Sequence, residues 1–96
     1  MLIKVTQEDI DLGKPRSYQY CPVALAVVRA CNRAVEYVSV GFGVVDVYLL
    51  PREHLMARYP AEVNTFIGNF DSGATVAPFE FELPLEPKRY SVLKDE

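Results

Sequence analysis

Two runs rich in β-branched residues, only three residues apart, restrict the possible folds of this chain more than any other feature. The runs are Val35–Val40 and Val44–Leu50, and Gly41-Phe42-Gly43 joins them. β-Branched side chains favour strands, and glycine supplies the backbone conformations that a tight turn between two strands requires. The pattern therefore predicts a β-hairpin with Phe42 exposed at its tip. Pro51 is expected to end the second arm, because proline cannot donate a hydrogen bond to a strand ladder.

Two shorter segments, one near each end of the chain, alternate between apolar and polar side chains. Residues 2–6 and residues 79–83 both show this period of two, which is typical of half-buried strands. Directly after the first of them, Thr6 followed three positions later by Asp9 has the form of a helix start. This start predicts a short helix that ends near Leu12.

Two longer segments have the composition of helices. Residues 21–32 are apolar nearly all round, with Pro22 suited to the first helical position and Asn32 to the stop, so this helix is expected to be largely buried. Residues 60–70 carry an apolar stripe at the i, i+3, i+4 and i+7 spacing of an amphipathic helix. Residues 52–59, which link the hairpin to this second helix, are expected to form a helical turn or an irregular connection.

These elements follow one another in the order β-α-β-β-α-β. A chain of 96 residues is long enough for one hydrophobic core, so we expect a single α+β domain over residues 1–96, with residues 88–96 as a flexible tail. The simplest closure of this order is a mainly antiparallel four-stranded sheet with two helices on one face, which is the ferredoxin-like arrangement.

Charge and hydropathy limit the kinds of partner and the compartment. The net charge of −3 argues against general nucleic-acid binding, although it is compatible with a small phosphorylated ligand. No segment has the roughly 18 uninterrupted apolar residues of a membrane span, and the first residues lack the order of a signal peptide. We therefore expect a cytoplasmic protein with no membrane partner.

The two cysteines are expected to be free thiols. Cys21 and Cys31 fall ten positions apart in the first long helix, which separates them by ~15 Å, well beyond disulfide reach. Free thiols are typical of a reducing cytosol. Cys21 is also a candidate reactive thiol, because a helix N-terminus lowers thiol pKa, but the distance of His54 in the sequence favours a packed, inert thiol.

Acidic residues and the single histidine give no catalytic or metal-binding pattern. Glu80 and Glu82 share one face of a predicted strand, and Asp46 in the hairpin is a candidate third ligand of a hard cation. More often such residues form the solvated face of a half-buried strand, and the chain has no CxxC and no histidine cluster. We therefore expect no metal, no cofactor and no enzymatic activity.

The loop before the first long helix supplies the best candidates for a ligand-binding site. They are two cations, two tyrosines and the residue at the helix N-cap: Lys14, Arg16, Tyr18, Tyr20 and Cys21. Cysteine caps a helix poorly, so the first N–H groups are expected to be open to an anion, and a tyrosine ring beside them can stack on a nucleobase. The alternative is an ordinary surface loop whose N–H groups bind water or Gln19.

Phe42 is the candidate residue for contact with a partner. An aromatic side chain at an exposed hairpin tip is suited to contact with another protein or with a second copy of the chain. The alternative is that Phe42 folds back on the sheet. A homodimer is a further expectation, because a domain of 96 residues has a thin core and gains from burying more surface.

Several motifs resemble those of a group of small uncharacterised proteins of tailed bacteriophages and prophages. The segments that carry the resemblance are VTQEDID at 5–11, CPVALA at 21–26 with Arg29-Ala30, FDSG at 70–73 and PFEFEL at 78–83. They cover both ends of the chain and the first long helix, and none of them is a catalytic motif. The resemblance implies a phage accessory protein that acts in the host bacterial cytoplasm.

Two functions follow as expectations. The first is a non-enzymatic binding protein, a phage anti-defence factor that sequesters a small phosphorylated, nucleotide-type signal. The alternative is a protein–protein inhibitor or adaptor that binds a host protein through the hairpin and an open sheet face. An enzyme ranks last, because the chain offers no nucleophile with a nearby base and no metal cluster.

Overall fold

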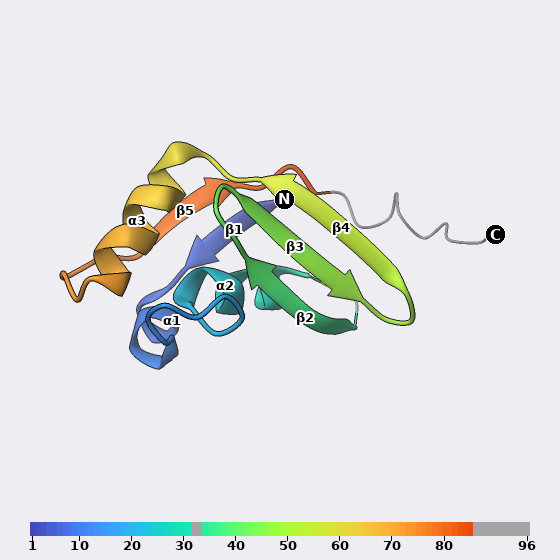
Figure 1. Ribbon diagram of the computed structural model, residues 1–96, viewed down its shortest axis with the longest axis horizontal. Helices are drawn as coiled ribbons and strands as arrows, with labels where there is room; N and C mark the ends of the chain where they lie inside the picture. Colours follow the sequence, from blue (N-terminus) through green and yellow to red (C-terminus); the bar gives the residue numbers. More distant parts are fainter. Residues whose placement is uncertain (32–33, 86–96) are drawn as a thin grey trace.

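Residues 1–31 and 34–85, which the computed structural model describes, form five strands and three helices. They are β1 (Leu2–Val5), α1 (Gln7–Leu12), α2 (Pro22–Ala30), β2 (Val35–Val40), β3 (Val44–Leu49), β4 (Glu53–Arg58), α3 (Ala61–Asp71) and β5 (Phe79–Glu82). The strands make two antiparallel sheets, one of order β2-β3-β4 and one of β1 with β5 (Figure 1). The α+β class is thus confirmed. The predicted helix stop at Asn32 and the predicted tail over residues 88–96 lie outside the described residues.

The predicted hairpin is confirmed, since β2 and β3 pair in antiparallel register with Val40 opposite Val45. Gly43 has φ +86, a left-handed conformation that glycine adopts without strain. The hydroxyl of Tyr59 closes the tip, because it accepts a hydrogen bond from Gly43 N at 2.8 Å and donates one to Gly41 O at 2.7 Å. A side chain from beyond β4 therefore fixes the turn.

Residues 52–59 do not form the expected helical turn or irregular connection, because six of them make β4, which pairs with β3 along its whole length. Side chains along β4 alternate between core and solvent, so that Leu55 is 1% exposed and Met56 is 60% exposed. The strand contains Glu, Met, Ala and Arg, which favour helices, and pairing with β3 overrides that propensity. Pro51 does end β3, but it lies in a turn that leads to a third strand.

In the described part of the chain the strands divide into a sheet of three and a sheet of two, so the expected four-stranded, ferredoxin-like sheet is not confirmed. β3 has β2 on one side and β4 on the other, and in the described part of the chain β1 pairs only with β5, with Ile3 opposite Phe81. The strand β4, which the sequence analysis did not predict, occupies the edge of β3 that does not pair with β2. The two long helices also pack on different strands (Figure 1). α2 packs on β1 and β2, whereas α3 contacts β5. The second contact is between the rings of Phe66 and Phe79, whose centroids are 4.7 Å apart.

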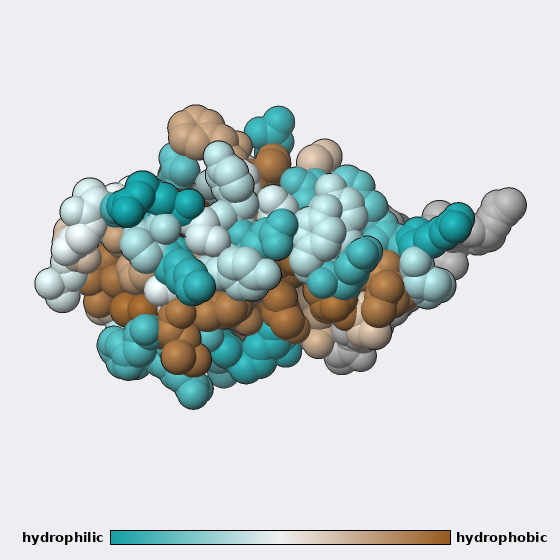
Figure 2. Space-filling model, turned by 60° about the horizontal axis from the view of Figure 1, so that its bottom comes forward, coloured by the Kyte–Doolittle hydropathy of each residue, from teal (hydrophilic) through white to brown (hydrophobic). Residues whose placement is uncertain are grey.

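α2 begins at Pro22 as predicted, and its inner side forms much of the core. Val23 and Val27 are fully enclosed together with Val47 of β3. The outer side of α2 is apolar as well, and Val28 is exposed there. Figure 2 brings the side of the molecule with α1 and α2 forward, and apolar side chains form a band across it between polar ones.

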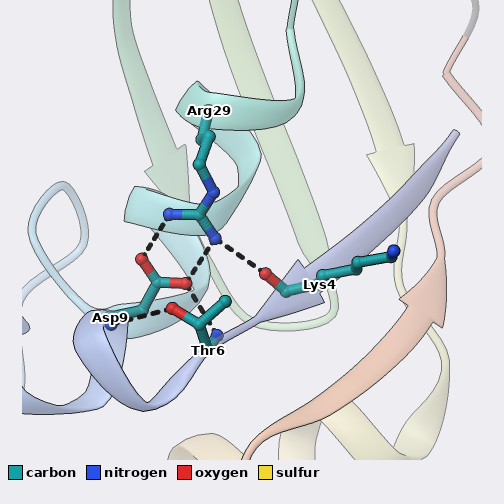
Figure 3. A network of polar contacts seen from close by, with 4 residues as sticks. All are labelled: Lys4, Thr6, Asp9 and Arg29. Atoms are coloured by element: carbon teal, nitrogen blue, oxygen red, sulfur yellow. Dashed lines mark hydrogen bonds and ion pairs between the residues drawn. The ribbon is translucent and has the colours of Figure 1, made fainter.

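A network around Asp9 fixes α1 to β1 and α2 (Figure 3). The predicted cap at Thr6 is present, with Asp9 N donating to Thr6 Oγ1 and Thr6 N donating to Asp9 Oδ2. The Asp9 carboxylate also accepts hydrogen bonds of 2.7 and 2.6 Å from the Arg29 guanidinium, which donates a third, of 2.8 Å, to Lys4 O. Asp9 is 3% exposed, so this carboxylate is a buried but well-paired structural group.

Candidate ligand-binding groove

A groove of about 710 Å³ lies between parts of the chain that are far apart in sequence. It is lined by the loop before α2 (Arg16, Ser17, Tyr18, Cys21), the hairpin tip (Val40, Gly41, Phe42), Tyr59 and α3 (Asn64, Ile67, Gly68, Asp71). A hydrogen bond of 2.8 Å from Val40 N to Tyr18 O holds the loop beside the hairpin. The volume falls within the ~300–1,000 Å³ that is typical of small-molecule sites.

The groove brings together several residues that the sequence singled out separately. They are Arg16, Tyr18, Cys21 and Phe42. Phe42 does not fold back on the sheet, because 93% of it is exposed, and the Tyr18 ring is open to solvent as well. Lys14 and Tyr20 do not line the groove, and the Lys14 ammonium instead lies 5.9 Å from the centroid of the Tyr20 ring, a cation–π contact.

Arg16 is held by Asp71, the last residue of α3. The Arg16 backbone N–H donates to Asp71 Oδ1 at 2.8 Å, and Arg16 Nη1 donates to Asp71 O at 2.9 Å. These bonds support a strained backbone, since Arg16 has φ +55, a left-handed conformation that costs a non-glycine residue ~1–2 kcal/mol. The remaining guanidinium N–H groups have no partner in the described part of the chain and are open to a ligand.

Cys21, at the N-cap of α2, is a buried thiol that is 4% exposed and makes no capping hydrogen bond. Burial is the main cause that raises the pKa of this thiol. The backbone N–H groups of Ala24 and Val23 lower the pKa in part, and the negative charge of Asp71 raises it further. Those two N–H groups thus lie near the buried sulfur, although neither makes a hydrogen bond of capping geometry to it. The environment is that of a packed, unreactive thiol, and Arg16 is left as the main anion-binding group of the loop.

We expect both free cysteines to react slowly with iodoacetamide at about pH 8, since burial raises the pKa of the Cys31 thiol as well. The rate should be at least about tenfold below that of a small free thiol, and it should approach that rate after unfolding in urea. Timed quenching followed by mass spectrometry measures each cysteine separately. Rapid labelling of Cys21 in the folded protein would contradict the buried N-cap.

Sequence reasoning missed the part of the groove that comes from Tyr59 and α3. The segment Asp71-Ser72-Gly73 indicated only the end of a helix, and Tyr59 was assigned to a connection. One signal was present in the sequence, because an acid in the last turn of a helix opposes the helix dipole. The position of Asp71 is thus unfavourable for the helix itself and points to a role outside it.

The acidic residues considered as cation ligands do not come together. Asp46 Oδ1 of β3 hydrogen-bonds His54 Nε2 of β4 at 2.7 Å, whereas Glu82 Oε2 of β5 accepts from the amino group of Met1 at 2.9 Å. Among the described residues, no group of three or more His, Cys, Asp or Glu is placed to hold a metal ion. None of the helices described is long and apolar enough to cross a bilayer.

An aromatic ladder runs across the open face of the larger sheet. The rings of Tyr37, Tyr48 and His54 stack in that order from β2 to β4, with 4.4 Å between the centroids of each neighbouring pair. Rings that stack on one another cover each other's faces, so the ladder stabilises the strand pairing and offers little room for a base to stack. Met56 is exposed on the same face.

The fold and the groove define a small α+β domain with a ligand-sized groove beside the hairpin tip. Comparison of the chain with protein-family models, with curated proteins and with solved structures finds no match. The chemistry of the groove is therefore the main guide to function.

Proposed function

We propose that this protein is a non-enzymatic binding protein that holds a small phosphorylated molecule of nucleotide type in the groove. The observation that carries the proposal is the convergence of aromatic rings and an available guanidinium on one groove of about 710 Å³. Aromatic rings stack on nucleobases, and guanidinium N–H groups bind phosphate. In the role that the phage resemblance implies, the protein sequesters a host defence signal in the bacterial cytoplasm.

The aromatic walls suit the base of such a ligand. Tyr18 and Phe42 come from the loop and the hairpin tip, which the hydrogen bond from Val40 N to Tyr18 O holds side by side. The hydroxyl of Tyr59 is hydrogen-bonded to the backbone of the hairpin tip, so the Tyr59 ring forms a fixed wall of the groove. Because the Tyr59 ring is already positioned, this wall of the groove needs little additional ordering when a planar group binds.

The charges of the groove suit one phosphate group better than a long polyanion. Arg16 and Asp71 are the charged residues among those that line it, so their formal charges cancel. The open N–H groups of Arg16 can bind a phosphate, whereas a polyanion would also meet the Asp71 carboxylate at short range. Lys14 supplies a further positive charge on the same loop.

Isothermal titration calorimetry with linear and cyclic nucleotides tests the proposal. We expect Arg16→Ala to weaken binding by about 1.5–3 kcal/mol, the value of a charge-assisted hydrogen bond. Replacing Tyr18 or Phe42 by Ala should each cost ~1–3 kcal/mol if a base stacks there. Arg16→Gly is a useful second variant, because it removes the guanidinium and relieves the strained backbone at the same time.

Two controls separate the groove from the rest of the surface. Tyr20→Ala removes an exposed tyrosine of the same loop that does not line the groove, and Glu80→Gln removes an exposed charge on β5. Both should bind nucleotides as the wild type does. If the wild type gives no heat with any nucleotide, or if Arg16→Ala binds at full strength, the groove is not a nucleotide site.

A second candidate is a protein–protein inhibitor or adaptor that acts through the hairpin and the open face of the larger sheet. The observation that favours it is the exposure of large apolar side chains there, Phe42 at the tip and Met56 beside the aromatic ladder. The expected homodimer is proposed for the same surface. Met56→Asp distinguishes the candidates, because it should disrupt a protein complex and leave nucleotide binding unchanged.

A further inference from the structure

We propose that Asp71 makes the groove selective for guanine among the nucleobases, an inference that rests on the nucleotide-binding function proposed above. In this arrangement the two carboxylate oxygens of Asp71 accept hydrogen bonds from the ring N1–H and the 2-amino group of guanine. The phosphate lies toward Arg16, and the base stacks on the aromatic walls.

The Asp71 carboxylate lies at the groove, and its oxygens keep lone pairs that can accept hydrogen bonds from a ligand. Asp71 is one of the lining residues and is half-buried. Its Oδ1 accepts the backbone N–H of Arg16 at 2.8 Å, which leaves a second lone pair on that oxygen, and no described residue donates to Oδ2.

Hydrogen bonds from Arg16 hold one oxygen of this carboxylate and the backbone of Asp71. Arg16 contacts Asp71 twice, through the backbone N–H to Oδ1 and through Nη1 to the Asp71 carbonyl. The acid sits at the end of α3 that the helix dipole makes unfavourable for a negative charge, and the last turn of α3 contains no basic residue. A fixed acceptor at such a position is preorganised for a ligand that brings hydrogen-bond donors.

Guanine is the common base that fits a carboxylate best. An ionised carboxylate only accepts hydrogen bonds, and the N1–H and 2-amino groups of guanine are two adjacent donors that match its two oxygens. In adenine and cytosine the amino group stands beside a ring nitrogen lone pair, which would face the second carboxylate oxygen. In uracil the N3–H lies between two carbonyl oxygens that the carboxylate repels. The acid therefore attracts guanine and disfavours the other bases.

Calorimetry of the full chain with GMP, IMP, AMP, CMP and UMP tests this selectivity. All five carry the same 5′-phosphate and ribose, so differences in affinity report on the base. We expect GMP to bind roughly 10- to 100-fold more tightly than AMP, CMP or UMP. IMP, which keeps the N1–H and lacks the 2-amino group, should fall between them. In Asp71→Asn the side-chain amide presents one acceptor and one donor, so GMP should lose its advantage and AMP should gain.

Glu62→Gln is the matched control, because it removes an exposed acid from the first turn of the same helix outside the groove. It should keep the wild-type order of affinities. Equal binding of the five nucleotides by the wild type, or an unchanged order in a folded Asp71→Asn variant, overturns the guanine assignment while leaving nucleotide binding intact. If none of the five nucleotides binds, the proposed function and this inference fall together.

Discussion

Replacing Arg29 by Met is expected to lower the free energy of unfolding by about 3 kcal/mol at neutral pH. The variant keeps most of the apolar stem of the side chain but leaves the Asp9 carboxylate, which is 3% exposed, without its guanidinium partner. It also leaves Lys4 O without the hydrogen bond from Nη2. The estimate stands at the lower end for a broken buried pair, because the Arg29 side chain is itself half exposed. Urea unfolding followed by circular dichroism measures the change.

The pH dependence gives this prediction a second readout. Burial alone would raise the pKa of Asp9, but hydrogen bonds from Arg29 and Thr6 outweigh it and hold the pKa below its ordinary value of 3.8. A carboxyl whose pKa is lowered by folding adds stability above the unfolded pKa, and that stability is lost as the pH falls through the folded pKa. We therefore expect wild-type stability to decline below about pH 4. In Arg29→Met burial acts on the Asp9 carboxyl without the opposing guanidinium, so the loss of stability in acid should be smaller or reversed, because protonation of Asp9 then favours the folded state.

Arg58→Met is the control for loss of a positive charge, because Arg58 is exposed on β4 and far along the chain from Asp9. It should change stability by less than about 0.5 kcal/mol. A double-mutant cycle of Arg29→Met with Asp9→Asn measures the coupling energy between these two side chains, because the effect of each substitution is compared with and without the other partner. A coupling energy near zero would mean that the network in Figure 3 does not stabilise the fold.

Replacing Leu55 by Ala is the second change with a large expected effect, a loss of about 2–4 kcal/mol in the free energy of unfolding. Leu55 is 1% exposed in the core, whereas its neighbour Met56 is 60% exposed, and Met56→Ala should cost less than about 0.5 kcal/mol. The pair tests β4 directly, because neighbouring residues of a strand point to opposite faces. Chemical denaturation of the two variants provides the measurement, and similar losses at both positions would rule out the strand.

Local patterns were sufficient for several elements of the fold. The β-branched runs with Gly41-Phe42-Gly43 between them predicted the hairpin, and Gly43 has the positive φ that such a turn requires. Thr6 and Asp9 predicted a helix cap, and Pro22 predicted the start of α2. Each of these signals acts over a few residues, through backbone conformation or a short-range hydrogen bond, so tertiary contacts reinforce it without having to create it.

The candidate site was predictable only residue by residue. The loop chemistry singled out Arg16 and Tyr18, and the hairpin tip singled out Phe42. That they line one groove depends on hydrogen bonds between distant segments, such as Val40 N to Tyr18 O. Asp71 was not foreseen as a site residue, because its meaning depends on the approach of Arg16, which is 55 positions away in the chain.

Strand pairing was likewise decided only by the tertiary structure. Residues 53–58 have helix-favouring side chains, and they become β4 because β3 offers a free edge and the core accepts Leu55. Once β2 and β4 flank β3, the strands at the two ends of the chain pair with each other in a separate sheet. Sequence periodicity specifies which face of a strand is buried, but it carries no information about which neighbour supplies the hydrogen bonds, so the division into two sheets arises from the competition among all five strands for partners.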